Sequence, residues 1–146
     1  MDDVRIRWAG KRQFVGWDQA GHGVVMDSTL THGGEGSGVR PLELVLYGLA
    51  GCTAMDVISI LEKKRQSVSA LEIHVQAEQR TDDYPKIYER INIHFVVSGR
   101  DVADTAVARS IELSEEKYCS VRGMLGPQVD VTTSFEVREA APENAD

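Results

Sequence analysis

A long apolar segment in the middle of the chain constrains the fold more than any other feature. Residues 42–61 are apolar apart from a few polar interruptions. The clearly polar ones are Glu43, Thr53, Asp56 and Ser59. Pro41 suits the first position of a helix, and the charged residues that follow Leu61 suit an end in solvent. The pattern therefore predicts one helix from about Pro41 to Lys64. Because this helix is apolar on nearly every face, it needs cover on nearly every face. A chain of 146 residues has difficulty supplying that cover alone, so we expect a partner subunit to supply part of it.

Strands are predicted on both sides of this helix. Before it, alternating apolar residues and turn signals predict strands at 4–9, 12–17 and 23–27. The glycine-rich stretch 28–41 lacks the Gly-Lys-Ser/Thr ending of a phosphate loop, and we interpret it as a flexible connection.

The second half of the chain begins with a predicted antiparallel hairpin, formed by strands at 69–79 and 87–99. It continues with helices at 101–118, with Asp101 as N-cap, and at 119–125, and a last strand at 129–139. Because the strands cluster in hairpins, the fold class is α+β with antiparallel sheets. We expect one domain over residues 1–146, with 139–146 as a frayed tail.

Composition limits the partners and the compartment. The net charge of −7 argues against a general binder of nucleic acid or anionic membranes. The N-terminus has no apolar core of a signal peptide, so we expect a cytoplasmic protein. The apolar run 44–55, bounded by Glu43 and Asp56, is shorter than the about 20 residues that span a bilayer, which favours a core helix. The two cysteines form no C-x-x-C motif and lie far in sequence from the four histidines, so no metal site is expected.

Cys52 lies in the middle of the apolar helix, where two interpretations stay open. Most unpaired cysteines in such surroundings are inert core residues. A reactive Cys52 needs a nearby cation, because burial and an ionised Asp56 one turn away both disfavour the thiolate. The helix dipole acts only near the first turn and cannot help. The candidate cations lie on other segments: Lys11, Arg12 and Arg40.

Cys119 and Glu43 are the other candidate site residues. Cys119 is predicted at the start of a short helix, where free N–H groups lower a thiol pKa; the alternative is a small buried residue at a helix junction. Glu43 falls in the first turn of the long helix, where it interacts with the dipole. Nine residues at about 100° each place it opposite Cys52, so it would more easily serve a partner subunit.

Two segments resemble a known family. RPLELVLYGLAGCTAMDVISILEKKRQ, residues 40–66, resembles the central helix of the OsmC/Ohr family, the osmotically inducible and organic hydroperoxide resistance proteins. LSEEKYCSVRGML, residues 113–125, resembles that family's second cysteine segment. The resemblance covers about 4–137 and is strongest to the OsmC-like branch, whose role is less settled.

The resemblance implies an intertwined homodimer, with antiparallel sheets wrapped around a long central helix and two sites at the interface. It implies a cysteine-based peroxidase without haem, flavin or metal, which reduces organic hydroperoxides at the expense of a dithiol. Cys52 matches the peroxidatic cysteine, Cys119 the resolving one and Arg12 the activating arginine. The family's glutamate falls at Leu42, and the carboxylate is one residue later, at Glu43.

The carboxylate at position 43 instead of 42 leaves two other functions open. One is a redox-sensing or ligand-binding dimer with little turnover. The other is a structural or interaction protein with two inert cysteines.

Overall fold

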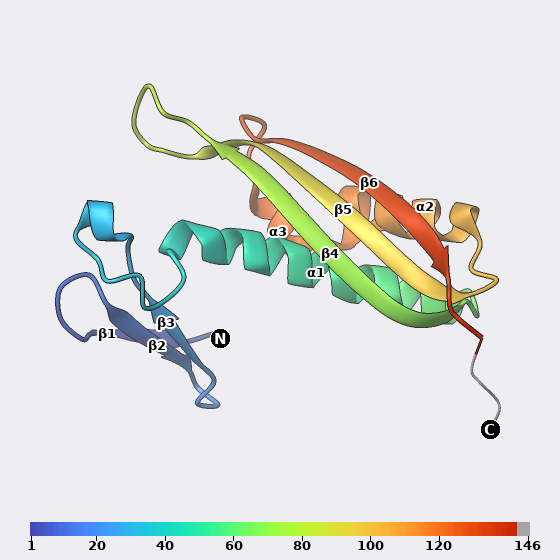
Figure 1. The fold of residues 1–146 in the computed structure, drawn as a ribbon, viewed down its shortest axis with the longest axis horizontal. Coiled ribbons are helices and arrows are strands. Elements are labelled where there is room, and N and C mark those ends of the chain that lie inside the picture. The colour runs from blue at the N-terminus through green and yellow to red at the C-terminus, as the bar shows by residue number, and fades with distance from the viewer. Residues whose placement is uncertain (143–146) are drawn as a thin grey trace. The chain divides into compact units, whose positions relative to one another are not determined.

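The computed structural model describes residues 1–142 (Figure 1), which divide into two compact units that meet between residues 47 and 48. The expected order of strands and helices is confirmed, with two short additional helical turns, η1 and η2. The elements are β1 (Val4–Trp8), β2 (Phe14–Asp18), β3 (Gly23–Met26), η1 (Leu30–His32), α1 (Pro41–Lys63), β4 (Ser67–Gln79), β5 (Tyr88–Arg100), α2 (Asp104–Leu113), η2 (Ser114–Tyr118), α3 (Ser120–Met124) and β6 (Asp130–Glu139). Of the predicted tail, Glu139 instead ends β6, and residues 143–146 lie outside the described residues. The single-domain expectation stays a prediction.

The N-terminal unit is a three-stranded antiparallel sheet in the order β1-β2-β3. Ile6 pairs with Gly16 and Val15 pairs with Val25, as expected for antiparallel strands that are joined by short turns. β1 is exposed along its whole length, including the apolar Ile6 and Trp8, which are 62% and 65% exposed. This unit therefore presents apolar side chains that it does not cover itself.

The second unit is a three-stranded sheet in the order β4-β5-β6 with helices on one side (Figure 1). The predicted hairpin of β4 and β5 is confirmed, with Ile73 opposite Phe95. From Ile91 to Gly99 every second residue of β5 is buried, Ile93, Phe95 and Val97 fully so, while the residues between them are half-buried. One face of this sheet is therefore the core, as the alternation of apolar residues predicts.

The last strand departs from the expected antiparallel sheets. β6 pairs in parallel with β5, with Phe95 opposite Phe135. Its connection runs through α2, η2 and α3, and a crossover of this length is what parallel neighbours need. The α+β fold class is confirmed, and the expectation of purely antiparallel sheets is wrong for this strand.

α1 buries only a narrow stripe within the chain. Its fully buried residues recur every four positions: Leu49, Thr53, Val57 and Leu61. Met55, on another face, is 76% exposed. Among the described residues, α1 is the one helix long and apolar enough to cross a membrane, a criterion that the core helices of soluble proteins also meet. Only 22% of its most apolar segment is buried. Much of the apolar surface of α1 is thus left without cover from the second unit, to which most of the helix belongs.

The second helical segment differs from the expected 101–118 helix. Asp101 is not the N-cap: its backbone is left-handed, with φ of 51°, and its N–H donates to the carboxylate of Glu139. Ala103 holds the N-cap position, and α2 begins at Asp104. After Leu113 the helix widens into η2, a π-helical turn that leads to Cys119. The expected short helix after Cys119 is confirmed as α3.

Candidate active site

The fold brings the two cysteines together, although they lie 67 positions apart. The Sγ atoms of Cys52 on α1 and Cys119 before α3, and a carboxylate oxygen of Asp56, all lie within 4.8 Å of one another. Both cysteines are free; Cys52 is half-buried and Cys119 is buried. A disulfide between them would require the two sulfurs to approach from this separation to about 2.0 Å.

The π-helical turn η2 and the first turn of α3 position Cys119. Its backbone N–H donates to the carbonyl of Ser114 at 2.9 Å, which closes η2. Its extended backbone makes it the N-cap of α3, where Sγ accepts a hydrogen bond from the N–H of Arg122 at 3.3 Å. A helix interrupted by a π turn next to a reactive group is a recurrent feature of functional sites.

Burial decides the protonation of Cys119. The expected lowering of its pKa at a helix start is wrong. Burial raises the pKa of the Cys119 thiol to about 11; the hydrogen bond from Arg122 opposes this rise, and Cys52 and Asp56 add to it. The effect of desolvation on the pKa is the larger one, because residue Cys119 is only 5% exposed and its sulfur accepts only one N–H, at 3.3 Å. Cys119 is therefore a neutral thiol at physiological pH.

Asp56 is a site residue that the sequence analysis considered only as an unfavourable charge. Ser114 donates from Oγ to Oδ2 of Asp56 at 2.8 Å. The same hydroxyl lies 2.9 Å from Oγ1 of Thr53, and both hydroxyl-bearing residues are fully buried. The sequence marks Thr53 and Asp56 as polar interruptions of an apolar helix, and this was the available sign of a polar site. No pattern in the sequence links them to Ser114, which lies 58 positions after Asp56. Two buried hydroxyls thus hold a carboxylate beside two sulfurs.

The three candidate cations all belong to the N-terminal unit. Lys11 pairs with Glu35 at 2.7 Å, and Arg40 pairs with Glu43. Arg12 donates to the carbonyl of Lys11 at 3.4 Å, and among residues 1–142 it forms no ion pair. Of the three, Arg12 is therefore the guanidinium left available for another anion.

Glu43 lies in the first turn of α1, as expected, where it pairs with Arg40. α1 is continuous from Pro41 to Lys63, so the rotation that places Glu43 opposite Cys52 on the helix holds.

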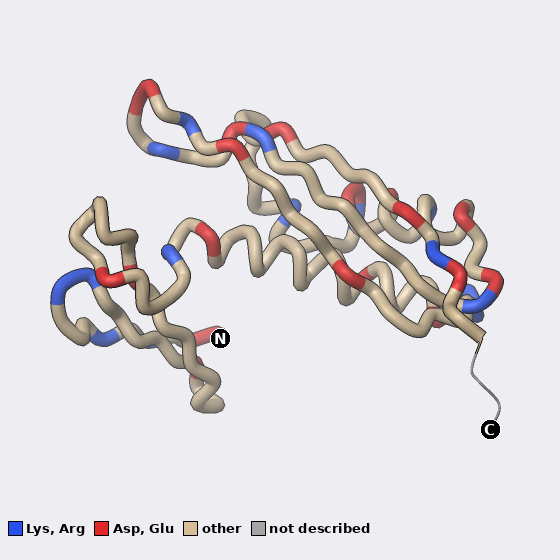
Figure 2. Tube along the Cα trace, in the orientation of Figure 1, with Lys and Arg blue, Asp and Glu red and all other residues tan. Residues whose placement is uncertain are grey.

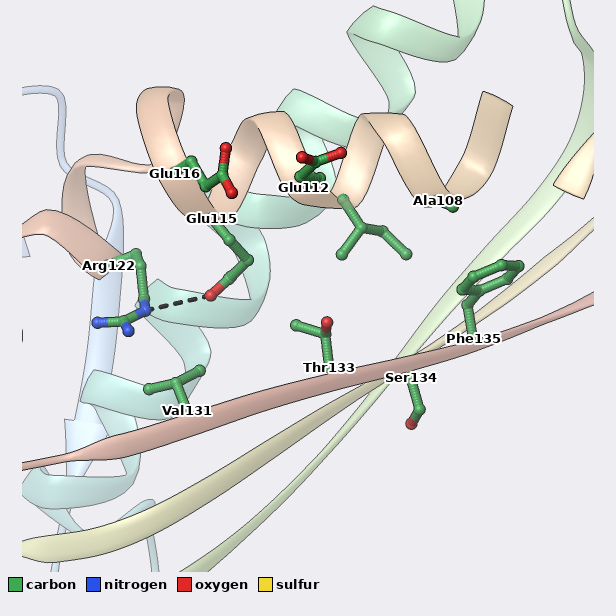
Figure 3. Close-up of a pocket in the computed structure, with 10 residues that line it drawn as sticks. Ala108, Glu112, Glu115, Glu116, Arg122, Val131, Thr133, Ser134 and Phe135 are labelled. Atoms are coloured by element: carbon green, nitrogen blue, oxygen red, sulfur yellow. Dashed lines mark hydrogen bonds and ion pairs between the residues drawn. The ribbon is translucent and has the colours of Figure 1, made fainter. Parts of the chain in front are cut away.

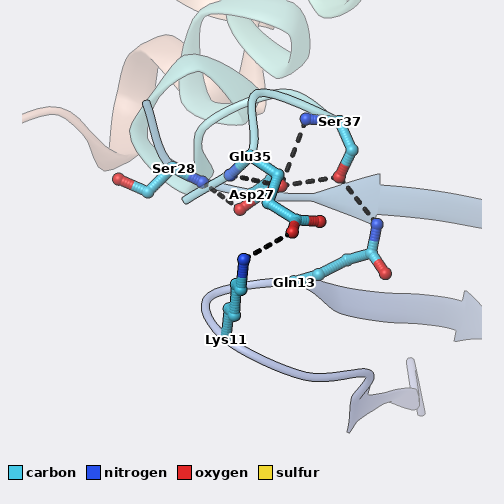
Figure 4. Close-up of polar contacts among 6 residues, drawn as sticks. All are labelled: Lys11, Gln13, Asp27, Ser28, Glu35 and Ser37. Atoms are coloured by element: carbon cyan, nitrogen blue, oxygen red, sulfur yellow. Dashed lines mark hydrogen bonds and ion pairs between the residues drawn. The ribbon is translucent and has the colours of Figure 1, made fainter. Parts of the chain in front are cut away.

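Asp27 organises the glycine-rich segment that the sequence analysis interpreted as flexible (Figure 4). Its buried carboxylate accepts hydrogen bonds from the N–H of Ser28, from the N–H of Glu35, and from both the N–H and the hydroxyl of Ser37. These bonds, the Ser37 hydroxyl first, lower the pKa of Asp27 to about 2. Glu35 then holds Lys11. Asp27 thus orders the loop, and the loop residue Glu35 holds Lys11 in the hairpin that carries two of the candidate cations, Lys11 and Arg12.

A cavity of about 620 Å³ lies between the helices α2 and η2 and the strand β6 (Figure 3). Phe135, Thr133 and Val131 project from β6 towards the helices, and Glu115 meets Arg122 at one end, 3.1 Å away. Burial raises the pKa of Glu115, against the effect of Arg122. Arg122 links this cavity to Cys119, since it lines the cavity and its backbone N–H donates to the Cys119 sulfur.

Comparisons with known proteins bear on the family and the fold of the chain. A family profile described as OsmC-like protein matches residues 34–134. The chain is 43% identical to the protein YhfA of Escherichia coli over 135 residues, 92% of this chain and 96% of that protein.

Among solved structures, a hypothetical protein from Aquifex aeolicus is 32% identical, with a TM-score of 0.83, over 97% of this chain and 98% of that one. An organic hydroperoxide resistance protein OsmC from Legionella pneumophila, described as a predicted redox protein, has a TM-score of 0.70 at 14% identity, over 94% of this chain and 97% of that one. This last likeness is one of fold.

Proposed function

The chain belongs to the OsmC-like protein family, and from this premise we propose that it is a cysteine-based peroxidase that reduces organic hydroperoxides. The observation that carries the proposal is the approach of the Cys52 and Cys119 sulfurs within 4.8 Å. Structural neighbours that are named as hydroperoxide resistance proteins support it at the level of fold.

The two cysteines take different roles in the proposed reaction. The Cys52 thiolate attacks the distal oxygen of the hydroperoxide; the O–O bond breaks, and the alkoxide takes a proton and leaves as an alcohol. Cys52 is then a sulfenic acid. Cys119 attacks it, the S–S bond forms, and the hydroxyl leaves with the thiol proton as water. A dithiol reductant, small or protein-bound, restores both thiols and becomes a disulfide itself.

Burial supports this division of roles. Cys52 is half-buried and within reach of a substrate, while Cys119 is buried and protonated. A protonated, inaccessible thiol is a poor first nucleophile, because thiolates attack peroxides. Cys119 is suited to the second step, in which it attacks the sulfenic acid of Cys52, whose sulfur lies 4.8 Å away or less.

We assign the activation of Cys52 to Arg12, whose guanidinium forms no ion pair within residues 1–142. Lys11 and Arg40 are the alternatives, each already paired with a carboxylate. Glu43, which lies opposite Cys52 on its own helix, is assigned to the orientation of the activating arginine at the site of a partner subunit. Because Glu43 pairs with Arg40, Arg40 is the second candidate for the cation that activates Cys52.

The proposed assembly is a homodimer that covers the apolar faces of α1. Val45, Tyr47 and Met55 on α1 are 37%, 63% and 76% exposed in the single chain. Exposed apolar side chains on a helix of this length mark an interface. A Met55→Lys substitution is expected to give monomers in light scattering, whereas Glu62→Lys, on the exposed end of the helix, is not.

We place the protein in the cytoplasm, without nucleic acid or membrane as a partner. Lys and Arg are dispersed along the chain (Figure 2), and the net charge is −7. A binder of phosphate backbones concentrates positive charge instead.

A redox-sensing or ligand-binding dimer is the second candidate. Asp56 favours it, since a fixed carboxylate beside Cys52 repels a thiolate, and Leu42 stands where the family's reductases carry glutamate. The two functions separate on the rate at which Cys52 is oxidised by a stoichiometric lipid hydroperoxide. A rate near that of a free thiol favours the sensor.

Intact-mass measurement after one equivalent of cumene hydroperoxide tests the peroxidase. We expect the reduced protein to lose two hydrogens, and the Cys119→Ser variant to gain one oxygen. Dithiol-dependent peroxide consumption should vanish in Cys52→Ser. Unchanged consumption in that variant contradicts the proposal.

A further inference from the structure

The cysteine pair and Asp56 form a set of metal ligands that spacing along the chain does not reveal. Two thiol sulfurs and a carboxylate oxygen from two separate segments converge within 4.8 Å. In a tetrahedral zinc site, bonds of about 2.0–2.3 Å place neighbouring ligand atoms roughly 3.5–3.8 Å apart. The observed separations need a contraction of only about 1 Å to reach this geometry.

We propose that the reduced protein binds one zinc ion through Cys52, Cys119 and Asp56. These are the donor atoms that zinc prefers, and three protein ligands leave a fourth position for water or another ligand. The two thiolates and the carboxylate carry three negative charges, which the divalent cation largely neutralises. Each thiol gives up its proton to solvent when the ion binds.

The surroundings of Asp56 are those of an oriented ligand. Ser114 donates to Oδ2 at 2.8 Å and is itself held by Thr53 at 2.9 Å. Both hydroxyl groups are fully buried, so water does not compete with this chain of bonds. A second layer of hydrogen bonds that fixes a ligand carboxylate is typical of metal sites, and its loss lowers the affinity by about 10–100-fold.

Oxidation and zinc binding exclude each other at this site. A disulfide between Cys52 and Cys119 removes both thiolate ligands, and a bound ion keeps Cys52 from a hydroperoxide. This consequence for turnover rests on the proposed peroxidase, whereas the binding of zinc to the reduced protein does not.

Cobalt titration of the reduced full-length protein without oxygen tests the proposal. We expect a thiolate-to-cobalt charge-transfer band and tetrahedral visible bands that saturate at one ion per chain, and equimolar zinc should displace the cobalt. The band should vanish in Cys52→Ser, in Cys119→Ser and in the disulfide form. Asp56→Asn and Ser114→Ala should keep the band and weaken the affinity by about tenfold or more.

Glu116→Gln is the matched control, since Glu116 is an exposed carboxylate on η2, and it should leave the titration unchanged. The absence of the band in the reduced protein, or its survival in Cys52→Ser, overturns the site. An unchanged affinity in both Asp56→Asn and Ser114→Ala overturns the assigned ligand set. Hydroperoxide turnover without cobalt binding refutes only this inference, and cobalt binding without turnover refutes only the peroxidase.

Discussion

The ionisation of Cys119 gives the sharpest prediction, and the Cys52→Ser variant isolates it by leaving one thiol. The pKa of Cys119 is raised from 9.0 to about 11, chiefly by burial, which this substitution leaves in place. A rise of about two units lowers the thiolate fraction at pH 8 roughly 100-fold. The more basic thiolate is about 6–10-fold more nucleophilic, which offsets part of this loss. Alkylation should therefore be at least about tenfold slower than for an unfolded cysteine, before restricted access slows it further.

Alkylation by iodoacetamide, followed by mass spectrometry of the tryptic peptide at residues 118–122, measures this rate. The native Cys52→Ser protein is compared with the same protein in urea, from pH 7 upward. We expect the native rate to keep rising with pH above pH 9, where the unfolded rate levels off. Equal native and unfolded rates at pH 8 would refute the argument that burial keeps Cys119 protonated, and with it the division of roles between the cysteines.

The same shift has a consequence for stability. Between pH 9.0 and about 11 the folded protein holds the Cys119 proton that the unfolded chain has lost, so folding stability from this group is complete below pH 9 and falls as the pH rises through the window. The Cys119→Ser variant lacks this group. Its unfolding free energy relative to wild type should be constant below pH 9 and should improve above it, as measured by urea denaturation.

Three further predictions concern the framework around the site. Asp27→Asn should reduce the loss of stability expected for the wild type as the pH drops from about 4 towards 2, since the lowered pKa of Asp27 stabilises the fold only above that range. Acid unfolding followed by circular dichroism measures this loss. Ser114→Ala should destabilise the protein by about 1–3 kcal/mol in urea, because Asp56 loses a buried donor. Gly99→Ala should cost about 1–3 kcal/mol or more in the same assay, because its Cβ would lie 2.1 Å from a backbone carbonyl, whereas Gly123→Ala, with open space, should not.

The parts of the fold that were predictable have short-range causes. The alternation along β5 predicted which face is buried, because successive side chains of a strand point to opposite sides. Pro41 marked the start of α1, because its ring fits the first turn of a helix. Each inference needed only neighbours within a few positions.

The parts that were missed depend on distant neighbours. The parallel pairing of β6 with β5 follows from the path of α2 and α3 across the sheet, which local patterns do not specify. The raised pKa of Cys119 follows from burial, whereas the sequence displayed only its place before a helix. The order of the loop after β3 depends on Asp27, whose partners come up to ten positions later.

The polar interruptions of α1 held more information than the apolar residues around them. A polar side chain in an apolar helix costs free energy unless it finds a partner. Thr53 and Asp56 both form hydrogen bonds with Ser114. Glu43 forms an ion pair with Arg40, and Ser59 is exposed. Each polar residue in this helix is therefore either exposed to solvent or bonded to a side chain outside the helix. Two of them, Thr53 and Asp56, converge on the hydroxyl of Ser114, and Asp56 lies beside both cysteine sulfurs.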